Sequence, residues 1–390
     1  MRQFLRYAFF AIVTLVVFIF LNNTNLFVSR PDREPIVLAH RGIAQRYDLA
    51  GVTNDTCTAS RILPPKHDYL ENTVASMQAS FKAGADIVEL DIHPTMDGQF
   101  AVFHDWTLDC RTDGHGVTHD HYMADLKKLD IGYGYTADGG KTYPFRGRGV
   151  GLMPTLAEVL ETFPDRSFLI NIKSNDPDEG SKLAAFLNAL PPERRSTIMA
   201  YGGDRPIAIL RAAVPAMKTM SRASLKKCLL GYIAYGWTGV IPGECHSTLV
   251  FVPVNVAPWL WGWPDRFLNR MDSAGSAAFV IGLIVVGTFQ PGWTVLKNYP
   301  ACRNTTAAAC LPTRSKWSPR GFEQSDEYGR SQLTLGLSPA TFLLSRQQAA
   351  SPLPPWLPSV HSPSFLSTPP QTPSLPCTNP FRLACRARGV

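Results

Sequence analysis

The sequence predicts an α/β fold, a (β/α)8 barrel of the TIM type, over residues 31–289 of the 390-residue chain. Short apolar runs alternate along this region with stretches of helical periodicity, which is typical of a parallel sheet wrapped by helices. Polar residues follow the carboxyl ends of these runs, at the edge where a barrel of this type carries its functional site.

The apolar runs define seven of the eight strands that such a barrel needs. They are 35–39, 86–93, 168–173, 197–201, 218–221, 249–254 and 277–286. Between them lie amphipathic stretches, among them 73–83, 155–162, 180–189 and 206–213. No clear eighth strand follows Val286, so we expect a poorly closed seam beside the first strand.

One additional strand interrupts the alternation. Asp97-Gly98 separates the run 86–93 from 100–103, and Asp-Gly between apolar runs is a strong hairpin signal. Glu89, Asp91 and His93 alternate along the first of these runs, so their side chains should share one face of the strand. Pairing about the turn would bring His104 close to Glu89.

Chemically active residues gather after these strands. Two imidazoles can act as general acid and base, carboxylates can hold a hard divalent cation, and cationic side chains can neutralise an anion. The residues in question are His40, Arg41, Glu71, Glu89, Asp91, His104, Asn171 and Lys173. Together they indicate metal-assisted attack on a phosphodiester.

These residues stand in motifs that resemble the glycerophosphodiester phosphodiesterase family, a group of phospholipase-C-like barrel enzymes. The motifs are His40-Arg41-Gly42, Glu71-Asn72-Thr73, Glu89-Leu90-Asp91 and His104-Asp105, and the resemblance covers about residues 35–287. It implies an enzyme that hydrolyses glycerophosphodiesters to glycerol 3-phosphate and an alcohol with the help of Ca²⁺ or Mg²⁺.

The resemblance also implies roles for individual residues. His40 and His104 would be the acid and the base, in an order that the sequence leaves open. Glu89, Asp91 and position 171 would hold the metal, and Arg41 and Lys173 would contact the phosphate. Glu71 would lie at the same site, or would serve only as a first-turn carboxylate favoured by the dipole of the following helix.

Two departures from the family pattern bear on activity. Asn171-Ile172-Lys173 replaces the usual Glu-Ile-Lys, and an amide oxygen can coordinate the cation but adds no charge. The missing closing strand is the second departure. A catalytically impaired, truncated family member, or an inactive binding protein, is therefore the alternative to an active enzyme.

Residues 1–30 are expected to form a membrane helix. Arg2 and Arg6 precede the apolar run 7–21, an arrangement that keeps the N-terminus in the cytoplasm. No small-x-small cleavage site follows, which favours an uncleaved signal anchor over a removed signal peptide. Either alternative places the rest of the chain outside the cytoplasm, on the periplasmic or extracellular side.

Cysteine usage agrees with export. The chain has eight cysteines, and an even number outside the cytoplasm favours disulfides. Cys57 and Cys110 lie in segments that should flank the site, so we expect them to pair, with two free thiols as the alternative. Cys228 and Cys245 form a second expected pair.

Three tryptophans follow the strand 249–254 and bear on the substrate. Trp259, Trp261 and Trp263 would line the substrate mouth, sit at a lipid interface, or pack a loop onto the rim of the barrel. An anchored enzyme with such a loop could act on a lysophospholipid. A lysophospholipase D or phospholipase D-like hydrolase of intact lipids is thus the alternative function.

The tail 290–390 is expected to be mostly disordered. Ten prolines fall within residues 351–380, a density that blocks both helix and sheet. From residue 301 onward nine Lys/Arg face three Asp/Glu, so the tail carries +6 of the formal net charge of +7. The basic excess is therefore no sign of a nucleic-acid partner, and we expect none.

Overall fold

The structure is a computed structural model that describes residues 1–28, 36–53 and 56–282. The predictions for the tail 290–390, for the end of the strand 277–286 and for the absence of a closing strand lie outside the described residues. All described residues belong to one compact unit, Met1–Phe322.

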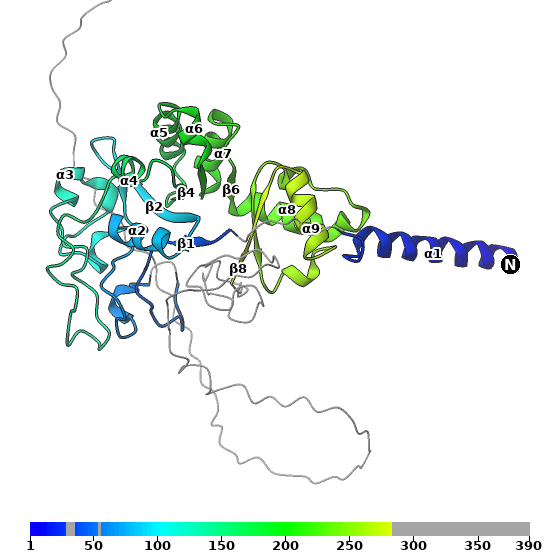
Figure 1. Ribbon diagram of the computed structural model, residues 1–390, viewed down its shortest axis with the longest axis horizontal. Coiled ribbons are helices and arrows are strands. Elements are labelled where there is room, and N and C mark those ends of the chain that lie inside the picture. The colour runs from blue at the N-terminus through cyan, green and yellow to red at the C-terminus, as the bar shows by residue number, and fades with distance from the viewer. Residues whose placement is uncertain (29–35, 54–55, 283–390) are drawn as a thin grey trace, which may run out of the picture. The chain divides into compact units, whose positions relative to one another are not determined.

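Parallel strands in sequential order form the sheet. The pairing runs through β1 (Leu38–His40), β2 (Ile87–Pro94), β4 (Ser167–Ile172), β5 (Ile198–Gly202) and β6 (Thr219–Ser221). β7 (Leu249–Pro253) pairs in parallel with β8 (Ala277–Ile281), and a bridge between Thr219 and Thr248 connects β6 to this pair. The seven predicted parallel strands are thus present in consecutive order, which confirms the (β/α)8-type fold class. Figure 1 labels β1, β2, β4, β6 and β8 among them.

The predicted hairpin is also present. β3 (Phe100–Val102) pairs antiparallel with β2, with Ile92 opposite Val102 and Pro94 opposite Phe100. The turn contains Gly98 at a positive φ of 75°, a conformation that glycine adopts without strain. This pairing brings the segment after β3, which contains His104, alongside β2.

Helices follow most of the strands, and polar N-caps begin several of them. Thr73 caps α2, Thr155 and Glu158 form a capping box on α4, and Ser221 caps α8. The α-helices after the N-terminal one are α2 (Val74–Lys82), α3 (Met123–Leu126), α4 (Leu156–Thr162), α5 (Pro177–Asn188), α6 (Pro192–Ser196), α7 (Asp204–Ala213), α8 (Arg222–Tyr235) and α9 (Asp265–Ser273). Short 3₁₀ turns are η1 (Ala59–Arg61), η2 (Leu108–Cys110), η3 (Thr118–Asp120), η4 (Gly236–Thr238), η5 (Gly243–Cys245) and η6 (Ala257–Trp259).

Alternation along the strands separates two apolar layers. Val88, Leu90 and Ile92 of β2 pack outward into a cluster with residues of α2, α4, α5 and α7. Ile87 belongs to an inner cluster with β1, β4, β7 and β8. Glu89 and Asp91 have the same parity as Ile87, so they lie on the inner face, as predicted.

The N-terminal helix α1 (Arg2–Asn23) has 22 residues, a mean hydropathy of 2.5 and no buried residue. By length and composition it is apolar enough to cross a membrane. A membrane anchor and a signal sequence both fit these properties.

Both predicted disulfides are confirmed. Cys57 is bonded to Cys110, and Cys228 is bonded to Cys245. The first links the long segment after β1 to the loop after His104. The second links α8 to η5.

Candidate active site

The turn after β1 is shaped by its contact with β2. Arg41 adopts a positive φ of 58°, and its backbone N–H donates to the carbonyl of Glu89 at 2.9 Å. Gly42 follows at φ 75°, where a Cβ would lie 2.5 Å from Oγ of Ser76. The His40-Arg41-Gly42 motif therefore forms a tight turn that places His40 and Arg41 side by side at the end of the strand.

The Arg41 side chain joins two carboxylates in a buried position. Its Nη1 lies 2.9 Å from Oε1 of Glu71, and its Nε lies 3.1 Å from Oδ2 of Asp91. Burial alone would lower the pKa of Arg41, but Asp91 and Glu71 raise it above the ordinary value. The guanidinium is thus a fixed positive charge beneath the ends of β1 and β2.

Glu89 and Asp91 differ in their ionisation. The Tyr201 hydroxyl, at the end of β5, donates to Oε1 of Glu89 at 2.7 Å. Burial, and next the negative charge of Asp91, raises the pKa of Glu89 to about 8. Against the effect of burial, Lys173 and Arg41 hold the pKa of Asp91 well below its usual value.

Hydrogen-bond donors surround Asp91. Nδ2 of Asn171 donates to Oδ1 at 2.7 Å, and Nζ of Lys173 lies 3.6 Å from the same oxygen. Nδ2 of Asn72 donates to Oδ2 at 3.0 Å. Asn171 therefore lies beside Asp91 as predicted, where it acts as a hydrogen-bond donor to the carboxylate.

His104 is held through a chain of charged groups. Its Nδ1 lies 2.6 Å from Oδ1 of Asp105, whose Oδ2 lies 3.0 Å from Nε of Arg111. Burial, and next Arg41, lowers the pKa of His104 to about 4. Because Asp105 remains a carboxylate, it accepts a hydrogen bond from Nδ1–H of His104. The proton of the neutral ring is therefore on Nδ1, and Nε2 is unprotonated.

His40 contacts another carboxylate of the cluster. Its Nε2 is 3.7 Å from Oε2 of Glu89. Burial, followed by the charge of Arg41, holds the pKa of His40 well below its ordinary value. Both predicted histidines are therefore neutral at pH 7 in the structure, and both lie next to acidic side chains.

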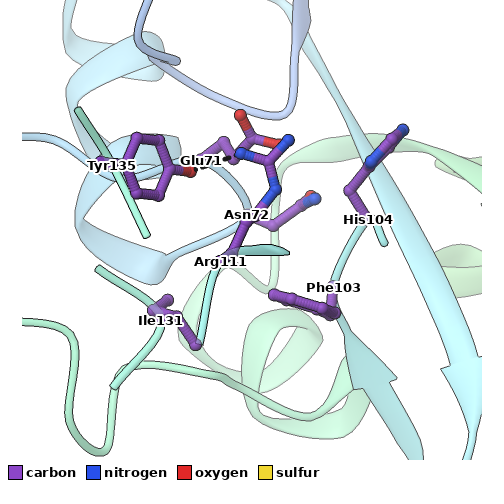
Figure 2. A pocket seen from close by; sticks show the side chains of 7 residues that line it. All are labelled: Glu71, Asn72, Phe103, His104, Arg111, Ile131 and Tyr135. Atoms are coloured by element: carbon purple, nitrogen blue, oxygen red, sulfur yellow. Dashed lines mark hydrogen bonds and ion pairs between the residues drawn. The ribbon is translucent and has the colours of Figure 1, made fainter. Parts of the chain in front are cut away.

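A small pocket lies between His104 and the Glu71 side chain (Figure 2). Its volume is about 10 Å³, close to the space of a single water molecule. Its lining residues are Glu71, Asn72, Phe103, His104, Arg111, Ile131 and Tyr135. Figure 2 shows Arg111 and Glu71 beside each other, with the Tyr135 hydroxyl directed at them.

Arg111 is a residue of this site that the sequence analysis did not assign to it. Its Nη2 lies 3.4 Å from Oε1 of Glu71 and donates to the Thr58 hydroxyl at 2.7 Å, and its Nη1 donates to the Tyr135 hydroxyl at 2.9 Å. Asn72, Asp105 and Tyr201 were also missed as contact residues, although each lies in or directly after a recognised motif or strand. For Arg111 the signals were the fit of Arg111-Thr112 to the family pattern and its position next to Cys110.

The charges of the site nearly cancel. At neutral pH Glu89 is protonated, so three carboxylates (Glu71, Asp91, Asp105) face three cations (Arg41, Arg111, Lys173), and with both histidines neutral the site sums to zero. A phosphodiester adds −1, and a divalent cation adds +2. With both bound, the site would carry +1.

The donor chemistry fits a divalent cation of the Mg²⁺ type. Glu89 and Asp91 provide two carboxylates on one strand face, and Mg²⁺ is commonly bound by one or two carboxylates, substrate phosphate and waters. Within the described part of the chain, no group of three or more His, Cys, Asp or Glu side chains is arranged as a metal site. This agrees with the loss of a third carboxylate at Asn171.

The buried histidines predict acid sensitivity of the fold. His40, His93 and His104 have pKa values below the ordinary 6.5, so below about pH 6.5 the unfolded chain binds three protons that the folded chain does not. Glu89 and Glu179, with their raised pKa values, each bind one extra proton in the folded state, which leaves a net difference of about one. We expect the melting temperature of chelated protein to fall from pH 6.5 to pH 4.5.

Calorimetry of the wild type and of His93→Gln tests this expectation. The variant should show a shallower pH dependence, because it removes one of the three histidines. A melting temperature that rises over the same interval would contradict the assigned protonation states.

The sequence is similar to proteins of known family. Residues 40–217 match the model of the Glycerophosphoryl diester phosphodiesterase family. A glycerophosphodiester phosphodiesterase of Caldanaerobacter subterraneus is 41% identical over 103 residues, which are 26% of this chain and 39% of the relative. One of Bacillus subtilis is 41% identical over 123 residues, 30% of this chain and 41% of the relative. A human lysophospholipase D is 35% identical over 118 residues, 28% of this chain and 34% of the relative.

Solved structures of the same kind are also similar. The crystal structure of a glycerophosphodiester phosphodiesterase from Agrobacterium tumefaciens has a TM-score of 0.40 and 21% identity, over 63% of this chain and 84% of that one. Residues 40–217 of this chain therefore match the glycerophosphoryl diester phosphodiesterase family. The chain spans about two fifths of the length of the Caldanaerobacter subterraneus and Bacillus subtilis relatives.

Proposed function

We propose that this chain hydrolyses glycerophosphodiesters to glycerol 3-phosphate and an alcohol. The observation that carries the proposal is the position of His40 beside Glu89 and of His104 beside Asp105, within one buried cluster of carboxylates and arginines. Residues 40–217, which match the family model, include all the residues of this cluster. The relatives named as glycerophosphodiester phosphodiesterases add support.

The two histidines take different roles in the proposed reaction. Nδ1–H of His104 donates a hydrogen bond to Asp105, so Nε2 of His104 is available to remove a proton from the attacking water. Glu89, protonated in the free site, would pass its proton to His40, whose Nε2 lies 3.7 Å from Oε2 of Glu89, and the resulting imidazolium would protonate the leaving oxygen and return to the neutral ring. Arg41 and Lys173 provide positive charge for the phosphoryl oxygens, where charge increases in the transition state.

Glu89 and Asp91 are the proposed ligands of a divalent cation, with Asn171 in the third position. When bound, the cation would polarise the phosphoryl group as a Lewis acid. The donor set favours Mg²⁺ over Ca²⁺, because Ca²⁺ takes six to eight oxygen ligands and the protein provides few.

Metal removal is expected to abolish activity, and Mg²⁺ should restore it. The Asn171→Glu variant should bind Mg²⁺ more tightly than the wild type, because it adds a charged oxygen ligand. Isothermal titration calorimetry measures this affinity independently of turnover. Asn171→Asp is the matched comparison. It adds the same charge as Asn171→Glu, but its side chain is one methylene group shorter, so its carboxylate lies further from the proposed cation.

Full activity in exhaustively chelated enzyme would refute the metal requirement. An unchanged Mg²⁺ affinity in Asn171→Glu would remove position 171 from the ligand set. The two outcomes are separate, because the first concerns the reaction and the second concerns one ligand.

Lysophospholipids are the second candidate substrate class. Trp259 is 71% exposed on the loop after β7, whereas Trp261 donates to the Ile233 carbonyl and Trp263 packs against Phe267. One exposed tryptophan and the apolar helix α1 favour a substrate at a lipid surface, and one relative is a lysophospholipase D. Turnover of glycerophosphocholine compared with lysophosphatidylcholine distinguishes the two classes.

We also propose that α1 anchors the enzyme in a membrane, with the catalytic body outside the cytoplasm. The apolar composition of α1, the basic residues at its N-terminus and the two disulfides support this placement.

A further inference from the structure

The end of α1 is held by two arginines of α9, outside the site described above. Nη2 of Arg270 donates to the carbonyl of Asn22 at 2.8 Å, and Nη1 donates to Oδ1 of Asn23 at 3.1 Å. Nε of Arg266 donates to the carbonyl of Thr24 at 3.3 Å. The last carbonyls of a helix lack intrahelical partners and carry its negative dipole end, so cationic donors stabilise them.

Asparagine side chains strengthen this attachment. Asn22 and Asn23 each donate to the carbonyl of Trp237 at 2.9 Å. Asn25 donates to the carbonyl of Trp263 at 2.7 Å and accepts from the N–H of Arg266 at 2.9 Å. The helix is therefore joined to the folded body through specific contacts in addition to the chain that follows it.

A pocket of about 230 Å³ opens where α1 meets α9. Its lining residues are Asn22, Val28, Gly239, Arg266, Asn269, Arg270 and Ser273. Gly239 has a positive φ of 91°, and a Cβ there would lie 3.1 Å from Nδ2 of Asn22. A larger residue at 239 would press on the end of α1 and on the pocket wall.

The polar chemistry of this pocket suits an anion. Within the described residues neither Arg266 nor Arg270 forms an ion pair with a carboxylate. The side chains of these two arginines donate to backbone carbonyls, to the Asn23 amide oxygen and to the Tyr232 hydroxyl. Arg270 already donates through both of its Nη atoms and adds positive charge, whereas Nη1 of Arg266 has no hydrogen-bond partner within the described residues and can donate to a phosphate.

The position of the pocket indicates the source of the anion. A helix of 22 residues is about 33 Å long, close to the hydrocarbon thickness of a bilayer of about 30 Å. With α1 across the membrane, Asn22 in its last turn lies at the level of the lipid headgroups. Leu26, Phe27 and Val240, within two residues of the pocket residues Val28 and Gly239, are exposed apolar side chains that would contact lipid.

We propose that this pocket binds the phosphate of an anionic phospholipid headgroup in the leaflet where α1 ends. The proposal rests on the membrane placement given under the proposed function, but not on the hydrolytic activity. Binding there would fix the orientation of the catalytic body on the membrane, because the lipid would contact both the anchor and α9.

Lipid selectivity of the full-length protein in vesicles tests the proposal. Tryptophan fluorescence is quenched by brominated lipids, and Trp237 and Trp263 belong to the segments that hold α1. Brominated phosphatidylglycerol in phosphatidylcholine vesicles should quench more strongly than brominated phosphatidylcholine. The Arg266→Gln variant should reduce the preference for phosphatidylglycerol by about tenfold, as expected for a lost charged contact.

Arg205→Gln is the matched control. α7 begins Asp204-Arg205 as α9 begins Asp265-Arg266, and Arg205 is exposed and remote in sequence from the pocket. The preference of the Arg205→Gln variant for phosphatidylglycerol over phosphatidylcholine should equal that of the wild type. Arg270 is less suitable for substitution because it also donates to Tyr232 and to the carbonyl of Gly236.

Three outcomes would overturn the proposal. Equal preference in the wild type and Arg266→Gln would show that the pocket does not select the lipid. Displacement of brominated phosphatidylglycerol by excess inorganic phosphate, dependent on Arg266, would assign the pocket to a soluble anion. Quenching by neither lipid would refute the membrane placement of α1, and no outcome depends on turnover.

Discussion

Replacing His104 with alanine is expected to lower turnover of a glycerophosphodiester by about 10²–10⁴-fold, the usual range for a general acid or base. The expectation follows from the unprotonated Nε2 that the Asp105 contact leaves on a neutral ring. His40→Ala should cause a loss in the same range. His119→Ala should have little effect, because His119 is a half-exposed residue paired with Asp120 outside the cluster.

Changing the leaving group of the substrate distinguishes the acid role of one histidine from the base role of the other. A p-nitrophenyl ester needs no protonation of its leaving oxygen, so His40→Ala should recover most of its activity on that substrate. His104→Ala should remain slow on both substrates, since the base is still missing. Recovery in His104→Ala instead would reverse the two roles, and near-wild-type turnover in either variant would remove that histidine from the mechanism.

Arg111→Met should lower the free energy of unfolding by about 3–5 kcal/mol, the cost of breaking a buried ion pair by removing one partner. Arg111 is 2% exposed and contacts Glu71 and Asp105, which would lose their shared counter-charge. Turnover should fall as well, because Asp105 holds His104. Chemical denaturation and steady-state kinetics measure the two effects.

Arg148→Met provides the control for this substitution. Arg148 pairs with Asp68 at 2.8 Å, but both side chains are more than half exposed, and such surface pairs contribute about 0–1 kcal/mol. A similar small loss in Arg111→Met would mean that Glu71 and Asp105 do not depend on Arg111.

The sequence predicted the parts of the site that follow regular elements. Glu89 and Asp91 could be placed on one face because a strand alternates with a period of two. His104 could be brought next to β2 because Asp97-Gly98 defines a hairpin. The resemblance then supplied the roles of His40, Arg41 and Lys173, which local periodicity does not reveal.

Arg111 and Tyr135 could not be predicted in the same way. Both lie in the long connection between β3 and α4, whose course is set by short turns, the Cys57–Cys110 bond and side-chain contacts. No periodic pattern specifies such a path. Thr58 and Arg111 each follow one half-cystine, so the predicted disulfide could have pointed to their contact, which the structure contains.

Phosphorus NMR of purified full-length protein with glycerophosphocholine and Mg²⁺ tests the central claim most directly. We expect the phosphodiester signal to be replaced by that of glycerol 3-phosphate in the wild type, and to persist in a His40→Ala/His104→Ala double variant of unchanged circular dichroism. A phosphodiester signal that stays unchanged with folded, Mg²⁺-loaded wild-type protein would contradict the proposed hydrolysis.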